Sequence, residues 1–207
     1  MSHPATPAAP PALIAAAFGE RLEAAQQYVD LLLTDGVVRG LIGPREADRI
    51  WERHLANSAA LGSLIPHGVG VTDIGSGAGL PGVPLALLRP DLQVVLLEPM
   101  QRRVDFLVEC IGTLGLTHVV VRRGRAPEDL RPAPGDFGVV RAVAPLDRLV
   151  DTARPLLRAG GTLLALKGRA AQAEMDTVRR QNLPVRLDVV PASFADQSAT
   201  VVRVRPA

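Results

Sequence analysis

The chain has 207 residues, of which 47% are hydrophobic and 21% are charged, and its formal net charge is +2. This composition is typical of a folded domain and is too apolar for a disordered chain. Aromatic residues make up only 3%, which argues against a surface that stacks nucleobases. The single cysteine, Cys110, excludes an internal disulfide framework and a cysteine-rich zinc site.

The first residues do not form a signal peptide, and no apolar run approaches the ~20 residues that a membrane span needs. We therefore expect a cytoplasmic, monomeric protein without membrane contact. The four histidines show no metal-ligand spacing, so no metal is expected. Of the 23 basic residues only Lys167 is a lysine, which distinguishes this position from the other basic residues.

In chain order, residues 1–11 carry four prolines and predict a flexible tail. Apolar residues at helical spacing predict one helix from about residue 11 to 34, which Gly36 and Gly40 would end. Pro44 suits the first position of a second helix that runs to about residue 64. These helices would form an N-terminal helical extension over residues 12–68.

From residue 69 to 207, short apolar runs alternate with helical stretches. Strands are expected at 71–74, 93–97, 118–121, 137–141, 161–166, 185–191 and 200–204, and helices at 82–89, 100–115, 146–158 and 169–181. Five alternations predict an α/β fold, with a doubly wound parallel sheet covered on both faces. Only about eight residues separate the last two strands, too few for a parallel crossover, so the seventh strand should be antiparallel.

The strongest motif is a glycine-rich turn after the first of these strands. Asp73 ends the strand, and Gly75, Gly77 and Gly79 follow at every second position. Glycines there let a ligand lie against bare backbone, and the next helix points its N-terminal amides at the site. Glu98, 19 residues after Gly79, ends the second strand, where a carboxylate can bind both ribose hydroxyls. The combination predicts a nucleotide-type ligand.

S-adenosylmethionine matches this turn better than a dinucleotide does. The glycine spacing is G-x-G-x-G, and dinucleotide sites usually have G-x-G-x-x-G. Asp73 would repel a pyrophosphate but suits the cationic amino group of S-adenosylmethionine. A reversed seventh strand is also typical of class I methyltransferases with a Rossmann-like sheet. An NAD-binding oxidoreductase or a non-catalytic nucleotide-binding module remains the weaker alternative.

Over residues 18–204 the chain resembles the RsmG (GidB) family of 16S rRNA methyltransferases. The matching stretches, in family order, are Arg53-His-Leu-Ala-Asn-Ser58, Asp73-Ile-Gly-Ser-Gly-Ala-Gly-Leu-Pro-Gly-Val-Pro84, Leu97-Glu98, Arg123-Gly-Arg-Ala126, Arg141-Ala-Val-Ala144 and Leu166-Lys-Gly168. Two segments depart from the family pattern. Thr34-Asp-Gly-Val-Val-Arg-Gly-Leu41 replaces a common Trp-Asn-Lys…Asn-Leu-Thr segment, and Asn57 stands where many members have Asp.

The resemblance implies N7-methylation of a guanine in the 530 loop of 16S rRNA, near the streptomycin site. This guanine is position 527 in the usual rRNA numbering. The implied cofactor is S-adenosylmethionine, and the implied partner is 16S rRNA or a precursor of the small ribosomal subunit. Residues on the strand-end loops are expected to bind the cofactor: Asp73, Gly75, Gly77, Gly79, Leu80, Glu98, Arg125, Ala126, Pro127 and Arg141. Residues expected to bind RNA are Arg53, His54, Arg123, Arg125 and Lys167, the last as a point contact to a phosphate.

The chemistry of the side chains is consistent with this reaction. Cytosine C5 methylation needs a cysteine nucleophile, but Cys110 lies in a predicted helix away from the strand ends. Guanine N7 has a free lone pair at neutral pH, so positioning can suffice and no general base is assigned. Arg141, directly after the fourth strand, is the predicted positioning residue. A small-molecule methyltransferase on the same fold remains an alternative.

Overall fold

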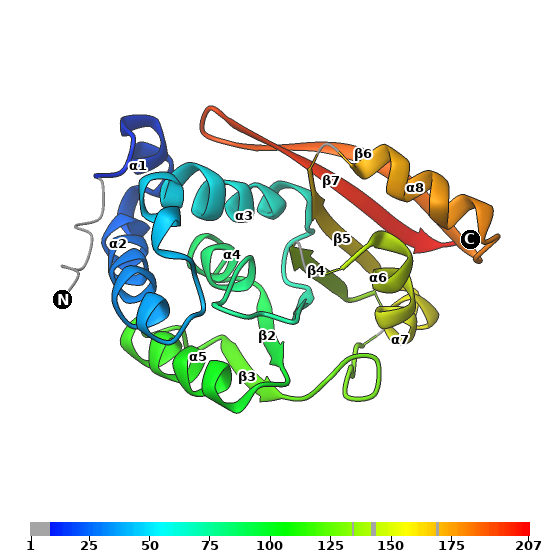
Figure 1. Ribbon diagram of the computed structural model, residues 1–207, viewed down its shortest axis with the longest axis horizontal. Coiled ribbons are helices and arrows are strands. Elements are labelled where there is room, and N and C mark those ends of the chain that lie inside the picture. Colours follow the sequence, from blue (N-terminus) through cyan, green and yellow to red (C-terminus); the bar gives the residue numbers. More distant parts are fainter. Residues whose placement is uncertain (1–8, 134, 142–143, 169) are drawn as a thin grey trace.

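The computed structural model describes residues 9–133, 135–141, 144–168 and 170–207, so residues 1–8 of the predicted flexible tail lie outside the described residues. One seven-stranded sheet runs through the molecule in the order β3-β2-β1-β4-β5-β7-β6 (Figure 1). The strands are β1 (Gly70–Ile74), β2 (Gln93–Glu98), β3 (Val119–Arg123), β4 (Phe137–Arg141), β5 (Thr162–Lys167), β6 (Val185–Phe194) and β7 (Gln197–Pro206).

Strands β1 to β5 pair in parallel, and β7 is antiparallel to both β5 and β6. The predicted doubly wound sheet with a reversed seventh strand is therefore confirmed. Only Ala195 and Asp196 connect β6 to β7, so the two strands form a tight hairpin. Both strands are longer than predicted, because the pairing continues as far as Phe194 and Gln197.

Helices cover both faces of the sheet. Side chains of successive strand residues point to opposite faces, and on β5 Leu164 joins one buried cluster while Leu163 and Ala165 join the other. The helices that follow the strands are α4 (Gly82–Leu88), α5 (Gln101–Thr113), α6 (Leu146–Thr152), α7 (Arg154–Arg158) and α8 (Ala171–Arg180). The single helix predicted for 146–158 is wrong: the chain breaks at Ala153, because Pro155 has no N–H to continue the helical hydrogen bonds.

The N-terminal extension is helical as predicted, but less regular. The first stretch divides into α1 (Ala12–Phe18), η1 (Gly19–Arg21), α2 (Leu22–Leu31) and η2 (Leu32–Gly36). Gly19 breaks it with a φ of 52°, a conformation that a regular helix does not accept. The second stretch begins at Pro44, as predicted, and consists of η3 (Pro44–Arg49), η4 (Ile50–Ala56), α3 (Asn57–Ala59) and η5 (Ala60–Leu64).

The extension and the sheet share one hydrophobic core, which includes Ile14 and Trp51 from the extension and Val201 from β7. At the tip of the β6–β7 hairpin, the ring of Phe194 lies 5.0 Å from the ring of Phe18 in an edge contact. The hairpin thus reaches over α3 toward the N-terminal helices (Figure 1).

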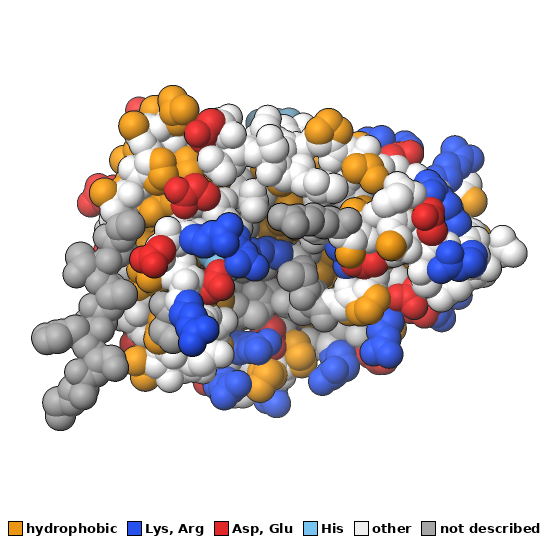
Figure 2. All heavy atoms as spheres, turned by 45° about the horizontal axis from the view of Figure 1, so that its top comes forward, with side chains coloured by type: hydrophobic (Ala, Val, Ile, Leu, Met, Phe, Trp, Pro, Cys, Tyr) orange, Lys and Arg blue, Asp and Glu red, His pale blue; other side chains and the backbone are white. Residues whose placement is uncertain are grey.

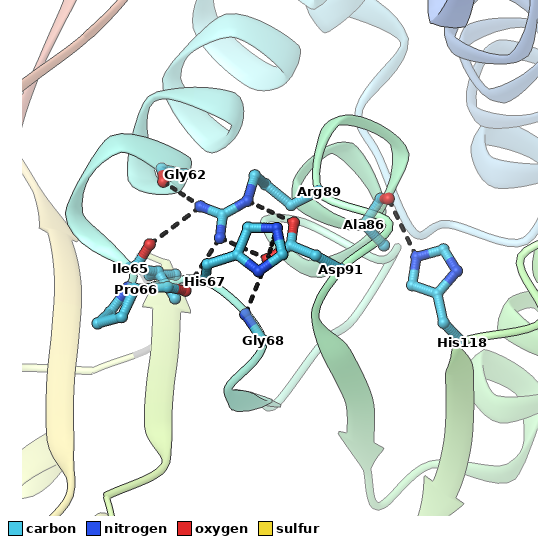
Figure 3. A network of polar contacts seen from close by, with 9 residues as sticks. All are labelled: Gly62, Ile65, Pro66, His67, Gly68, Ala86, Arg89, Asp91 and His118. Carbon is cyan, nitrogen blue, oxygen red and sulfur yellow. Dashed lines mark hydrogen bonds and ion pairs between the residues drawn. The ribbon is translucent and has the colours of Figure 1, made fainter.

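A polar network joins the two regions at the opposite, N-terminal edge of the sheet (Figure 3). The guanidinium of Arg89 donates hydrogen bonds to the carbonyls of Gly62, Ile65 and Pro66, at the end of η5, and pairs with Asp91 at 2.7 Å. Carbonyls at a helix end have no partner within the helix, so Arg89 supplies one. The predicted boundary near residue 68 is therefore crossed by both apolar and polar contacts. Among the described residues, no helix is long and apolar enough to cross a membrane.

Candidate functional site

The candidate site lies where the carboxyl ends of the parallel strands meet. β1 is flanked by β2 on one side and β4 on the other, so the strand order reverses between β1 and β4. Ligands of open α/β sheets bind at such switch points. The glycine turn after β1, Glu98 at the end of β2 and Arg141 at the end of β4 all lie at this edge.

The three glycines of the turn all have positive φ angles, 75° at Gly75, 59° at Gly77 and 96° at Gly79. An added Cβ at Gly79 would come within 2.7 Å of Val83 and 3.0 Å of the Tyr28 hydroxyl, so close packing also requires glycine there. At Gly77 the nearest atom would be 3.9 Å away, so this glycine leaves open room above bare backbone. The turn has the form that a ligand-binding loop needs.

Glu98 ties the glycine turn to the end of β2. Its carboxylate is only 1% exposed and accepts hydrogen bonds from the N–H groups of Gly77 (2.9 Å) and Met100 (3.0 Å). Arg103 lies 3.7 Å from the same carboxylate. A carboxylate has about four acceptor positions, so two remain for ribose hydroxyls. Glu98 therefore lies beside the loop, as the sequence predicted, and also holds the loop in place.

Asp73 lies beneath the turn rather than on its surface. One carboxylate oxygen, Oδ2, accepts a hydrogen bond from the N–H of Gly82 at the start of α4 (2.9 Å). The other, Oδ1, is buried and has no hydrogen-bond partner among the described residues. Burial raises the pKa of Asp73 to about 7, opposed by the hydrogen bond from the N–H of Gly82. A cationic group placed at Oδ1 would satisfy this oxygen and favour the ionised form.

A cavity of about 200 Å³ adjoins the turn. Its lining comes from the ends of β1 to β3 and the residues after them, from α6 and from Ala144 before it: Ile74, Gly75, Leu97, Pro99, Gly124, Arg125, Ala126, Ala144, Leu149 and Thr152. The apolar side chains suit an adenine ring. The predicted residues Gly75, Arg125 and Ala126 line this cavity. The other predicted cofactor residues do not belong to its described lining: Asp73, Gly77, Gly79, Leu80, Glu98, Pro127 and Arg141. The acceptor oxygens of Glu98 and the unpartnered Oδ1 of Asp73 lie on the neighbouring strand ends, so the chemistry of these groups matches that of S-adenosylmethionine.

A second cleft, of about 410 Å³, opens at the ends of β4 and β5. It combines residues from the extension, from the ends of β4 and β5 and from β7: Arg53, Asn57, Arg141, Leu166, Lys167, Gly168, Ser198, Ala199 and Thr200. Three of its side chains are cationic, and no Asp, Glu, His or Cys belongs to its described lining. Basic side chains also gather near the middle and along the lower rim of the face in Figure 2. The cleft suits an electron-rich or anionic ligand.

The guanidinium of Arg141 contacts a histidine of the N-terminal extension. Nη2 of Arg141 lies 2.7 Å from Nδ1 of His54, and Nε2 of the same ring lies 2.6 Å from Oε2 of Glu46. His54 is 7% exposed, so neither nitrogen is free for an outside partner. Burial, and then the positive charge of Arg141, lowers the pKa of His54 to about 4. Nη1 of Arg141 is buried and has no hydrogen-bond partner within the described residues.

Lys167 lines the cleft, but its ammonium already has protein partners. Nζ lies 2.8 Å from Oε2 of Glu174 and donates to the carbonyl of Ala144 at 2.7 Å, and the side chain is only 6% exposed. The same Glu174 oxygen accepts from the N–H of Leu146 at the start of α6. Lys167 thus connects β5, α8 and the segment after β4. The predicted phosphate contact stays a prediction, and it would require the ammonium to share or leave Glu174.

The arginines at the carboxyl end of β3 and just after it are placed differently. Arg122, Arg123 and Arg125 are exposed, and their guanidinium groups form no hydrogen bond or ion pair with the described residues. Arg53, also predicted to bind RNA, is exposed and lies 3.7 Å from Glu46. These side chains can meet an outside anion without breaking an internal hydrogen bond.

Three residues of the site have no signal in the sequence pattern. Tyr28 donates from its hydroxyl to the carbonyl of Ala78 in the glycine turn, at 2.8 Å. Glu46 orients His54, and Glu174 binds Lys167. Nothing marks these residues in the sequence, because each acts through a tertiary contact. In the part of the chain that the structure describes, no group of three or more His, Cys, Asp or Glu side chains could hold a metal ion.

Solved structures with little sequence similarity share the fold. A precorrin-6y C5,15-methyltransferase from Geobacter metallireducens superposes with a TM-score of 0.52 at 14% identity, over 80% of this chain and 90% of that one. A protein of the NADB-Rossmann superfamily from Streptococcus agalactiae gives 0.55 at 15% identity, over 73% and 68%. At such low identity these likenesses concern the fold alone.

Sequence relatives are much closer. Proteins named ribosomal RNA small subunit methyltransferase G are 53% identical in Thermobifida fusca (strain YX), over 90% of this chain and 81% of the relative, and 51% identical in Mycobacterium sp. (strain JLS), over 96% and 92%. The family model GidB, described as rRNA small subunit methyltransferase G, matches residues 21–198. The chain therefore belongs to the GidB family of small subunit rRNA methyltransferases.

Proposed function

We propose that this protein methylates N7 of a guanine in the 530 loop of 16S rRNA, with S-adenosylmethionine as the methyl donor. One observation carries the proposal beyond family membership. An apolar cavity beside the glycine turn and a cationic cleft without Asp, Glu, His or Cys in its described lining open at the same edge of the sheet. This pairing suits transfer of a methyl group to a nucleophile that needs no deprotonation.

The cofactor would be held by the glycine turn and the strand ends around it. Glu98 would accept hydrogen bonds from the ribose hydroxyls, and Oδ1 of Asp73 would pair with the amino group. Leu97 and Ala126 would contact the adenine from the cavity wall. S-adenosylmethionine supplies an electrophilic methyl group on a sulfonium. The remaining task of the chain is to place an acceptor atom in line with that methyl group.

The side chains around the cleft favour guanine N7 over other acceptors. A cytosine C5 acceptor would need a thiolate, but Cys110 is fully buried on α5, and burial raises the pKa of its thiol to about 12. Guanine N7 carries a free lone pair and needs no base. Its neighbour O6 is an acceptor that a guanidinium recognises well, and Arg141 and Arg53 both line the cleft. Arg141 is then a positioning residue and not a proton acceptor.

Exposed arginines beyond the cleft would bind the RNA backbone. Arg123 ends β3 and Arg125 follows it at the same sheet edge, with guanidinium groups free of protein partners among the described residues. Contacts of this kind carry little sequence information and fix the register of the nucleic acid. The target base would then be selected within the cleft.

The decisive experiment maps modified nucleotides of 16S rRNA by mass spectrometry in cells with and without this protein. We expect one N7-methylguanosine in the 530 loop to disappear and to return when the wild-type gene is supplied. The Arg141→Ala variant should not restore it. A methylated guanine that persists without the protein would refute the proposal. Parallel assays on naked 16S rRNA and on assembled small subunits would identify the form of the substrate.

A further inference from the structure

We infer that His54 is a positioning residue of the methyl-transfer site, which holds the guanidinium of Arg141 at the cleft while Glu46 fixes its tautomer. The sequence predicted an RNA contact for His54. The geometry instead commits both ring nitrogens to protein partners, and the ring is nearly inaccessible. The inference rests on the proposed function, since it concerns the same reaction.

The hydrogen-bond partners decide the tautomer of His54. A guanidinium can only donate, so Nδ1, 2.7 Å from Nη2 of Arg141, must be the acceptor. The ring proton then lies on Nε2 and is donated to the carboxylate of Glu46, 2.6 Å away. The three groups therefore form a directed chain from Arg141 through a neutral imidazole to Glu46.

The charged groups around His54 keep this arrangement at neutral pH. Arg141 faces the ring from β4, Arg53 lies on the same helical segment, and Glu46 faces it from η3. Only Glu46 favours the protonated ring, whereas burial and both arginines oppose it. A protonated ring would also turn Nδ1 into a donor that faces another donor. The neutral imidazole is thus the form that can hold Arg141.

The guanidinium of Arg141 therefore has a hydrogen-bond partner at one terminal nitrogen and lacks one at the other. Nη2 is bound to His54, while the buried Nη1 has no partner in the described chain. A buried donor without a partner is costly, and Arg141 lines the cleft, so an oxygen acceptor of the RNA would supply the missing bond. Through the contact between His54 and Arg141, the N-terminal extension also helps to position the reacting groups. The hydroxyl of Ser58 further anchors this segment by donating to the His54 carbonyl at 2.6 Å.

Two substitutions of His54 separate positioning from simple packing. In His54→Asn, the side-chain oxygen can take the place of Nδ1 and accept from Arg141. In His54→Leu, the apolar volume remains but no acceptor does. We expect kcat to fall about 10- to 100-fold in His54→Leu, because small displacements of a positioning group have effects of this order. His54→Asn should recover most of the loss, and KM for S-adenosylmethionine should stay unchanged in both.

His118 offers a matched control. Its ring is also partly buried and bonds through Nε2 to the carbonyl of Ala86 at 3.1 Å, but it lies before β3, at the sheet edge away from the cleft (Figure 3). We expect His118→Leu to retain the wild-type kcat. Thermal unfolding of every variant shows whether a loss of activity comes from a loss of fold. Wild-type kcat in a folded His54→Leu variant would overturn the inference.

A double-mutant cycle tests whether His54 acts through Arg141. In the Arg141→Gln background, His54→Leu should cause no further loss of kcat; a second loss of the full single-mutant size would overturn the inference. Wild-type protein that fails to methylate rRNA would refute the proposed function instead. The tautomer remains measurable in that case by ¹⁵N NMR of the imidazole at pH 7. A bare Nδ1 and a protonated Nε2 are expected, and an imidazolium or a protonated Nδ1 would contradict the inference.

Discussion

The hydroxyl of Tyr28 on α2 donates a 2.8 Å hydrogen bond to the carbonyl of Ala78, so the N-terminal extension directly supports the glycine turn. Tyr28 is fully buried, and burial raises the pKa of its hydroxyl well above the usual value, so the proton needed for the bond is retained. The same hydroxyl fills the space in which a side chain at Gly79 would lie. The extension is therefore a structural part of the candidate site.

Removing this hydroxyl should weaken both the fold and cofactor binding. In Tyr28→Phe the buried carbonyl of Ala78 loses its side-chain donor, which costs about 1–3 kcal/mol of unfolding free energy. The turn also loses a support, so we expect several-fold weaker binding of S-adenosylmethionine. Urea unfolding and isothermal titration calorimetry measure the two effects. Ser63→Ala is the control, because it removes an exposed residue's hydrogen bond to Ala60 and should change neither quantity. Wild-type affinity in Tyr28→Phe would show that the turn does not depend on the extension.

The ionisation of Asp73 should make cofactor binding dependent on pH. Burial raises its pKa to about 7, so the carboxyl becomes neutral as the pH falls through this value. A neutral carboxyl cannot form an ion pair with the amino group of S-adenosylmethionine. We therefore expect affinity to fall by about 10-fold between pH 7.5 and pH 6, since each pH unit below the pKa lowers the ionised fraction about tenfold. Calorimetry in buffers of different ionisation enthalpy should also detect proton release on binding near pH 6.5.

The control for this effect is Asp73→Asn, whose side-chain oxygen can still accept from the N–H of Gly82 and keep the start of α4 in place. We expect this variant to bind S-adenosylmethionine weakly and with little dependence on pH over the same range. The same tenfold dependence in Asp73→Asn would assign the titration to another group.

The features predicted correctly from the sequence were those determined by residues close to one another in the chain. Alternating apolar runs indicate the parallel sheet, and the short connection before β7 requires its reversal. The ends of β6 and β7 were missed because residues 192–199 lie largely beyond the rest of the sheet and lack a clear apolar alternation. Pro191, which suggests a strand end, is tolerated because β6 is an edge strand that pairs only with β7.

Site contacts between distant residues could not be predicted in the same way. Arg141 and His54 are 87 positions apart, and only the packing of the extension against the sheet end brings them together. The sequence indicated both as functional, but it assigned His54 to RNA because nothing local shows that its ring is enclosed. Lys167 likewise meets Glu174 only because α8 folds back over β5. Such contacts depend on tertiary structure and produce no periodic pattern in the sequence.

Replacing the Glu98 carboxylate by the corresponding amide should weaken the binding of S-adenosylmethionine. In Glu98→Gln one side-chain oxygen becomes an N–H₂ group, which would face the N–H of either Gly77 or Met100 as donor against donor. The ribose hydroxyls also lose acceptor positions. We expect S-adenosylmethionine to bind at least 10-fold more weakly, measured by calorimetry at pH 7.5. Glu109→Gln is the control, because Glu109 is half exposed and pairs with Arg39 outside the site. Equal affinity for Glu98→Gln and wild type would exclude Glu98 from the ribose contact.

Salt dependence should identify the arginines that contact the RNA backbone. Each arginine that neutralises a phosphate releases counterions, so its removal lowers the slope of log K against log salt by about 0.7–0.9. We expect this decrease for Arg123→Ala and for Arg125→Ala, measured by fluorescence anisotropy with a 530-loop RNA hairpin between 50 and 300 mM KCl. Arg158→Ala is the matched control, because Arg158 ends α7 before β5, at the sheet edge away from the cleft. A slope unchanged by Arg123→Ala, or lowered equally by Arg158→Ala, would show that the arginines at the end of β3 are not a specific phosphate-binding surface.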